Sequence, residues 1–179
     1  VGQALIAFSI IFAAVLITKS SPSTNPSMPS DTHLNSLKLA PVRVTESGHF
    51  QIGVPLDRYS GKFLTDGDAK THWHSPPADG RTTHWVAFDF MDQVVIRAVK
   101  LDSSGPKVSG PNNITISIRT MAGGWMPCHR LSHMWGNPAL GLAYSTGKCA
   151  RSTRGVRLEF DDTVRRMLYL GEVGLFGDR

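Results

Sequence analysis

The feature that most restricts the fold of this chain is a series of short segments, from about residue 58 onward, in which apolar and polar residues alternate. Five segments show this pattern or are rich in β-branched residues: 86–90, 94–101, 113–119, 155–160 and 167–176. Clusters of Gly, Pro, Asp and Asn separate them, and no convincing helical stripe interrupts them. Such alternation is typical of β-strands with one buried face. We therefore expect a mainly β domain, built as an antiparallel sandwich or barrel.

Length and composition leave room for one ordinary domain with an appendage. The chain has 179 residues, of which 41% are hydrophobic and 18% charged, which excludes intrinsic disorder of the whole chain. The formal net charge is +5, and the basic residues are scattered rather than gathered in a stripe, so we expect no nucleic-acid partner. Two cysteines are too few for a disulfide-dense scaffold or a four-cysteine zinc site.

The first residues, 1–18, are apolar and uncharged, and they predict one N-terminal transmembrane α-helix. Eighteen helical residues span roughly 27 Å, close to the ~30 Å hydrocarbon core of a bilayer. A buried helix and a leftover targeting segment are the alternatives. Residues 19–45 follow as a Ser- and Pro-rich tether and lead-in, and residues 46–179 form the predicted β domain.

Four segments of the β domain, taken in order, resemble one known family. They are DGDAKTHWHS at 66–75, HWVAFDF at 84–90, RGVRL at 154–158 and LGEVGLFG at 170–177. These segments are similar to the motifs of the discoidin family, the C-type domain of coagulation factors within the galactose-binding-like group, over about residues 58–177. The resemblance implies a jelly-roll β-sandwich of eight strands with ligand loops at one end. Met91 stands where the family usually has Gly, and residues 102–153 match by strand pattern alone.

The resemblance also implies a calcium site, because family members often hold this ion between the first and the last of these segments. Carried over residue by residue, the ligands are the side chains of Asp66, Asp68, Glu172 and Ser75 and the carbonyls of Phe63 and Gly171. Hard oxygen ligands around a Gly-containing turn suit Ca²⁺. The alternative is a simple turn at residues 66–67, with Glu172 paired to Arg154 or Arg157.

Other binding chemistries find less support in the sequence. His72, His74 and His84 could together bind zinc. The favoured interpretation is that they are loop or rim histidines that bind no metal. The His and two Arg that sugar-binding members use for fucose are absent in the family's spacing. The chain has no G-x-S-x-G, H-E-x-x-H or phosphate-loop motif, so we expect no enzymatic activity.

An irregular, Gly- and Pro-rich region at 121–147 contains aromatic and Met residues. Such residues mark interfaces when they are exposed. The predicted interface residues are Trp125, Met126, Met134 and Trp135, with the core of a long insertion as the alternative. Cys128 and Cys149 flank this region. We expect them to form a disulfide if the domain faces an oxidising compartment, and to be buried thiols otherwise.

Two functions from different classes follow. The first is a single-pass membrane protein that serves as a structural or interaction subunit of a larger membrane assembly, with protein subunits as partners. The second is a membrane-tethered recognition module that binds a glycan or protein ligand, with Ca²⁺ as its one conceivable cofactor. Either function places the β domain on the lumenal or extracellular side. The sequence does not distinguish an organellar membrane (thylakoid or inner mitochondrial) from the cell surface.

Overall fold

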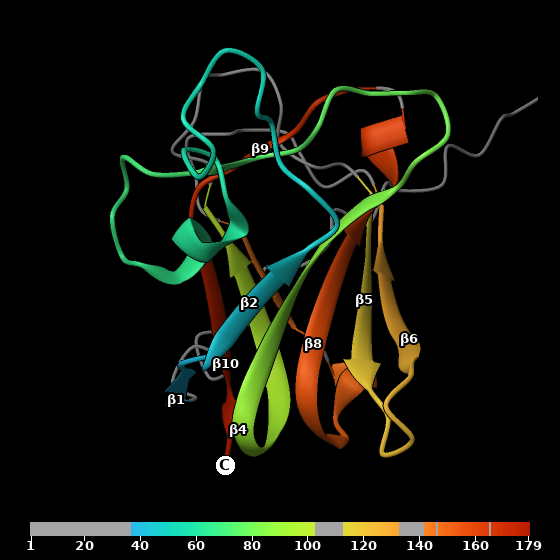
Figure 1. Cartoon of the computed structure of the whole chain (residues 1–179). Helices are drawn as coiled ribbons and strands as arrows, with labels where there is room; N and C mark the ends of the chain where they lie inside the picture. The colour runs from blue at the N-terminus through green and yellow to red at the C-terminus, as the bar shows by residue number, and fades with distance from the viewer. Residues whose placement is uncertain (1–36, 103–112, 133–141, 146, 165) are drawn as a thin grey trace, which may run out of the picture.

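The computed structural model describes residues 37–102, 113–132, 142–145, 147–164 and 166–179 (Figure 1). In chain order its elements are β1 (Leu37–Leu39), β2 (Arg43–Glu46), the 3-10 helix η2 (Gly61–Thr65), β3 (Trp73–His74), β4 (His84–Leu101), β5 (Ile114–Arg119), β6 (Trp125–Leu131), β7 (Leu142–Ser145), η3 (Gly147–Cys149), β8 (Ser152–Phe160), η4 (Asp161–Val164), β9 (Tyr169–Leu170) and β10 (Val173–Asp178). The predicted spanning helix at 1–18, residues 19–36 of the predicted tether and lead-in at 19–45, Met134 and Trp135 lie outside the described residues. Within the described ranges, no helix is long and apolar enough to cross a membrane.

Strand β4 is the longest strand and contributes to both layers of the fold. Its first part, residues 84–89, pairs with β2 and β8, whereas residues 95–101 pair with β10 and, toward the end, with β7. The register shifts between Asp89 and Val94, where the ribbon turns a corner (Figure 1). One strand therefore passes from one layer of the sandwich into the other.

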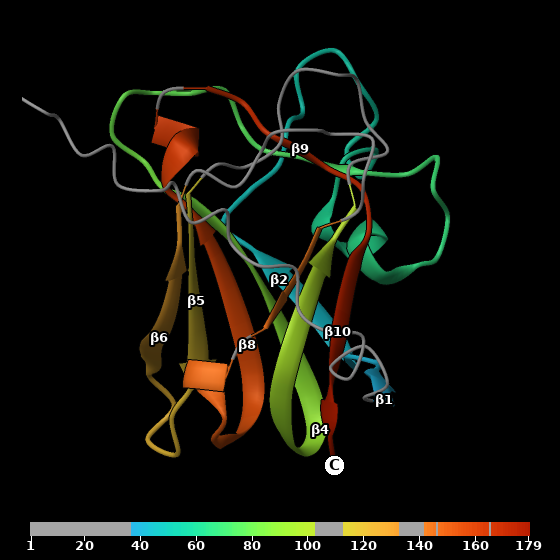
Figure 2. The ribbon, with the colours of Figure 1, turned by 180° about the vertical axis from the view of Figure 1, so that it is seen from behind.

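Two antiparallel layers result, which we call the front and back layers. The front layer has the order β2–β4–β8–β5–β6, and the back layer has the order β1–β10–β4–β7. Views from opposite sides show these layers facing each other, with the loops between β2 and β4 gathered at one end (Figures 1 and 2). The prediction of a mainly β sandwich is thus confirmed.

The alternating residues meet between the layers. In β5 the side chains of Ile114, Ile116 and Ile118 are all buried. Phe88 of the front layer and Ile96 of the back layer are fully buried in the same core. Burial of each such side chain stabilises the fold by roughly 1.5–3 kcal/mol before entropic costs. The period-two pattern in the sequence therefore reflects one continuous apolar core.

The strands begin and continue where the sequence was interpreted as irregular. Strand β1 starts at Leu37 and β2 at Arg43, both within the range predicted as lead-in, and they pair with β10 and β4, respectively. Trp125 and Met126, which we placed in an irregular region, begin strand β6. Pro127 is compatible with this strand because β6 pairs only with β5 in the described chain and its register shifts there.

Candidate functional site

The loop at residues 66–71, which we call the acid loop, follows η2 and meets the start of β10. Gly67 adopts a φ of 80°, a left-handed conformation that favours glycine. Its amide donates to Oε1 of Glu172 at 3.1 Å. The Asp68 amide and the Thr71 hydroxyl both donate to Oδ1 of Asp66 at 3.0 Å. The loop therefore brings Asp66 and Glu172, which are far apart in the sequence, to one place.

The two carboxyl groups influence each other's protonation. Burial raises the pKa of Glu172, and the adjacent Asp66 carboxylate raises it further through a shared hydrogen bond and its charge. Burial also acts to raise the pKa of Asp66, but hydrogen bonds from the Asp68 amide, Glu172 and Thr71 lower it below its usual value. Asp66 is thus the ionised member of the pair, and Glu172 is the member on which a proton is retained to higher pH.

Two further predicted ligands are occupied in other ways. Oδ1 of Asp68 accepts a hydrogen bond from the Lys70 amide at 2.9 Å. Ser75 is completely buried, and its hydroxyl contacts the Pro76 carbonyl at 3.1 Å and accepts from the Leu168 amide at 2.9 Å. The Ser75 hydroxyl therefore joins two chain segments of the small β3–β9 sheet rather than the acid loop.

Backbone hydrogen bonds hold the segment that carries the predicted Gly171 ligand. Phe63 lies within η2, and the Gly171 amide donates to the Asp102 carbonyl at 2.9 Å. The Asp102 amide in turn donates to the Glu172 carbonyl at 2.8 Å. These two bonds hold the residues before β10 against the end of β4, which fixes the position of the Glu172 side chain.

The alternative pairing of Glu172 with an arginine is wrong. Arg157 pairs with Glu159 on its own strand, at 2.8 Å. Arg154 is exposed and has no ion pair with any residue that the structure describes. Glu172 instead accepts from the Gly67 amide, so it closes the acid loop rather than the sandwich.

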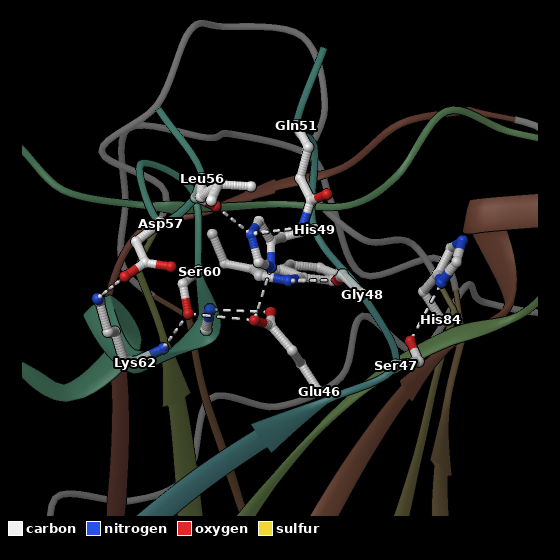
Figure 3. Close-up of polar contacts among 12 residues, drawn as sticks. Glu46, Ser47, Gly48, His49, Gln51, Leu56, Asp57, Ser60, Lys62 and His84 are labelled. Carbon is white, nitrogen blue, oxygen red and sulfur yellow. Dashed lines mark hydrogen bonds and ion pairs between the residues drawn. The ribbon is translucent and has the colours of Figure 1, made fainter. Parts of the chain in front are cut away.

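A cluster around Glu46 sets the position of η2 and thereby of the acid loop (Figure 3). Oε2 of Glu46 accepts from the Gly61 amide at 2.9 Å, and Oε1 accepts from the Ser60 hydroxyl at 3.1 Å. Nδ1 of His49 lies 2.9 Å from the same Oε1. Because η2 runs directly into Asp66, this half-buried carboxylate at the end of β2 anchors the segment that presents the acids.

Beside the acid loop, the outer surface of the back layer forms a cavity of about 330 Å³, which we call the Phe176 groove. It is lined by Lys38, Gly67, Ala69, Lys100, Asp102, Glu172, Gly174 and Phe176. The Phe176 ring lies over Gly174, since a Cβ added there would be only 2.8 Å from Cε2 of the ring. A glycine at this position therefore lets a half-exposed aromatic ring lie on the sheet surface.

Charged groups surround this ring on the neighbouring strands. Lys38 of β1 lies opposite Phe176, and Lys100 of β4 lies opposite Gly174, so both lysines share the ring's face of the sheet. Nζ of Lys100 is 3.9 Å from Oδ2 of Asp102. With Glu172 at one end, the groove offers an apolar ring, two ammonium groups and two carboxylates. Such a surface can stack on a ring-shaped ligand and hydrogen-bond its polar substituents.

The predicted interface residue Trp125 lies on the outer face of the front layer. Its ring is contacted by the guanidinium groups of Arg119, at 4.8 Å, and Arg157, at 5.4 Å. Arg157 also lies 5.6 Å from the Trp85 ring. Met126 packs instead against the core. Trp125 and Met126 thus point to opposite faces of the sheet, as successive strand residues do.

The histidines of the first family-like segment belong to an aromatic cluster. His74 is buried and stacks on Tyr169 with 3.9 Å between ring centroids, with Phe50 and Tyr59 close by. Burial, with a smaller contribution from His72, lowers the pKa of His74 to about 4. No group of three metal-ligating side chains occurs among the described residues. His74 is therefore a neutral packing residue at ordinary pH.

The similarity of this chain to known proteins lies in its structure. No protein-family model and no curated protein matches the sequence. Among solved structures, the CBM32-5 domain of a Clostridium perfringens protein, in complex with GalNAc-β-1,3-galactose, is 13% identical with a TM-score of 0.61 over 75% of this chain and 94% of that one. An F5/8 type C domain from Bacteroides fragilis is 14% identical with a TM-score of 0.65, over 76% and 91%.

A third structure is the family 32 carbohydrate-binding domain of NanJ from C. perfringens, in complex with galactose. It is 9% identical with a TM-score of 0.60, over 75% of this chain and 92% of that chain. The chain has the discoidin-like fold. The family resemblance in the sequence is confirmed at the level of fold, and two of these similar structures are complexes with a saccharide.

Sequence reasoning missed the Phe176 groove. Phe176 and Gly174 lie in the closing segment that carries the resemblance, but nothing local shows that their side is flanked by Lys38 and Lys100. That placement depends on the register of three strands distant in sequence. The sequence does carry one signal: Val173 and Leu175 are two positions apart, which puts Phe176 on the opposite face of the strand.

Proposed function

We propose that this chain is a non-catalytic carbohydrate-binding domain that holds a saccharide in the Phe176 groove. The observation that carries the proposal is a partly exposed aromatic ring in a concave surface, flanked by hydrogen-bonding charged groups, on a fold shared with glycan-bound proteins. The C–H face of a pyranose ring is apolar and stacks on an aromatic ring. Its hydroxyl groups require donors and acceptors, which the lysines and carboxylates provide.

The proposal predicts that Phe176→Ala weakens saccharide binding by about tenfold or more, because the stacking surface is lost. The measurement is isothermal titration of the full chain with galactose and GalNAc-β-1,3-galactose, followed by a glycan array. The melting temperature of the variant shows whether the fold is retained. Absence of saccharide binding by the wild-type chain to every glycan on the array would contradict the proposed function.

Phe50→Ala serves as the matched control, because Phe50 is a partly exposed aromatic residue in the aromatic cluster, away from the groove. We expect Phe50→Ala to retain saccharide affinity. If Phe50→Ala loses binding while Phe176→Ala retains it, the glycan site lies among the loops between β2 and β4. In that case the function stands and the assignment to the groove fails.

A role as a membrane-anchored accessory subunit stays a prediction. It depends on residues 1–18 and on Trp135, which lie outside the described residues. The similar structures favour glycan binding instead, since two of those reported above hold a saccharide. A lumenal or extracellular position, where glycans are found, is compatible with both interpretations.

Calcium is part of the proposal because the Asp66–Glu172 pair fits it in part. Two neighbouring carboxylates supply hard oxygen donors. Burial first, and then the hydrogen bond and charge of Asp66, raise the pKa of Glu172, and a bound cation would offset these effects. Ca²⁺ takes about six to eight oxygens. Among the described residues, no three acidic, His or Cys side chains lie close enough together to hold a metal ion. Carbonyls such as those of Phe63 and Gly171, with water, would therefore complete the coordination shell of Ca²⁺.

We expect calcium to raise the melting temperature of the full chain relative to chelator, because a ligand of the folded state alone stabilises it. Glu172→Gln should abolish this rise. In chelator the variant should melt at the wild-type temperature or above, since burial and Asp66 disfavour the charged form of Glu172. Equal wild-type melting temperatures in calcium and chelator would leave the pair as a proton-sharing closure of the loop.

A further inference from the structure

A second cavity, of about 290 Å³, lies where β4 turns its corner, where β5 turns into β6 and where β8 begins. We call it the Arg154 pocket. It is lined by Gln93, Arg119, Thr120, Met121, Gly123, Ser152, Thr153 and Arg154. These strand ends lie together at the end of the sandwich away from the loops between β2 and β4 (Figure 2). The pocket is therefore separate from the acid loop and the aromatic cluster.

The electrostatics of this pocket are one-sided. Two arginine residues, Arg119 and Arg154, are among its lining residues, and none of the lining residues is acidic. Arg154 is exposed and has no carboxylate partner in the described part of the chain. Arg119 is 2.8 Å from Asp89, but that carboxylate also accepts two hydrogen bonds from Arg43. The single negative charge of Asp89 is thus shared, and positive charge remains in excess at the pocket.

The donors are held in place by a buried residue between the strands. Thr153 is buried, and its hydroxyl contacts the Arg119 carbonyl at 2.9 Å and the Gly155 carbonyl at 2.9 Å. This contact joins the end of β5, which carries Arg119, to the start of β8, which carries Arg154. The guanidinium group of Arg119 is held by the Asp89 carboxylate and lies over the Trp125 ring.

Neutral groups complete the lining. Oε1 of Gln93 accepts from the Ser152 hydroxyl at 2.7 Å, which leaves the amide nitrogen of Gln93 as a donor. The Thr120 hydroxyl is used locally, since it donates to the Gly124 carbonyl at 3.2 Å. Met121, which is 99% exposed, stands at the mouth. Among the lining side chains, Arg154 and the amide nitrogen of Gln93 therefore offer hydrogen-bond donors.

We propose that the Arg154 pocket binds an oxyanion, a sulfate or carboxylate group carried by an acidic ligand. Guanidinium groups bind both anions through paired, charge-assisted hydrogen bonds, and they are more weakly hydrated than ammonium groups. A pocket lined by two arginine residues and by no carboxylate selects against cations. The site does not depend on saccharide binding at the Phe176 groove.

The test is titration of the full chain with sodium sulfate and, separately, with sodium glucuronate, at constant ionic strength maintained with sodium chloride. Binding is followed calorimetrically and by amide NMR shifts of residues 152–155. We expect saturable binding of at least one anion by the wild-type chain. Arg154→Gln should weaken it by about tenfold or more, because a charged hydrogen-bond donor is lost. Sulfate alone identifies a sulfate-type ligand, and binding of glucuronate identifies a carboxylate; each supports the proposal.

Arg151→Gln is the matched control, since Arg151 is an exposed arginine on the same segment that does not line the pocket. It removes the same charge and should leave affinity unchanged. Equal losses in Arg151→Gln and Arg154→Gln, or no saturable binding of either anion, would overturn the proposal.

Discussion

Replacing Gly177 with alanine is expected to destabilise the fold by at least about 3 kcal/mol, enough to unfold a marginal domain. A Cβ at Gly177 would overlap the carbonyl oxygen of Val95 and lie 3.2 Å from Cδ1 of Leu39. The overlapping atom belongs to the backbone of β4, so no side-chain rotation can relieve the clash. The register between β10 and β4 shifts at this residue, which brings the two backbones together.

Chemical denaturation followed by far-UV circular dichroism measures the effect. Gly124→Ala is the control, because a Cβ at Gly124 would meet only the Thr120 hydroxyl, at an ordinary 3.7 Å. We expect that control to change the free energy of unfolding by less than about 1 kcal/mol. A Gly177→Ala chain as stable as the wild type would show that β10 and β4 are not in this register.

This close approach gives a physical reason for the last glycine of the family-like closing segment. The sequence shows a Gly at position 177, and the resemblance places a Gly there, but neither explains it. The reason lies in the back layer, where β10 crosses β4 at an irregular pair. A motif residue of this kind is thus a packing constraint between strands that are distant in sequence.

Local patterns predicted the strands whose two faces differ most. Segments in β4, β5 and β8 alternate because one face enters the core, and that requirement is written directly into each segment. Strand β6 was missed because only Met126, Cys128 and Leu131 of its residues pack against the core, and a proline interrupts it. The alternation of apolar and polar residues is weaker in an edge strand, because hydrogen bonds to a single neighbouring strand are enough to form it.

The candidate site divides in the same way. The acid pair of Asp66 and Glu172 was reached through the resemblance, whereas Asp68 and Ser75 turn out to bond to Lys70, Pro76 and Leu168. A motif indicates which residue types lie together. It does not indicate which of their oxygen lone pairs remain free once the nearby backbone amides have formed hydrogen bonds. The Phe176 groove and the Arg154 pocket depend on register across several strands, for which a single sequence carries no direct signal.

Opening the disulfide between Cys128 and Cys149 is expected to destabilise the domain by about 3 kcal/mol. The two cysteines are 21 positions apart, so the bond restricts a substantial loop in the unfolded chain. It also has a specific place in the fold. Cys128 lies in β6, which pairs only with β5 among the described strands, and Cys149 is fully buried in η3, just before β8. The bond thus fastens the edge of the front layer to the core.

Melting temperatures of the full chain with and without dithiothreitol measure this contribution. We expect reduction to lower the wild-type melting temperature by several degrees, since about 3 kcal/mol corresponds to a shift of that size for a domain of this length. The Cys128→Ser, Cys149→Ser double variant should have a melting temperature close to that of the reduced wild type, and dithiothreitol should not change it. Trp125, three residues from Cys128 on the same strand, provides a fluorescence signal for loosening of β6.

The redox state of this pair in protein isolated from cells also tests the compartment. A disulfide of this kind persists outside reducing compartments, and glutathione keeps most cytosolic thiols reduced. Alkylation of free thiols before cell lysis should therefore leave Cys128 and Cys149 unmodified if the domain faces a lumen or the cell exterior. Complete alkylation of both would place the domain in a reducing compartment. There it would fold without the cross-link and with correspondingly less stability at the edge that carries Trp125.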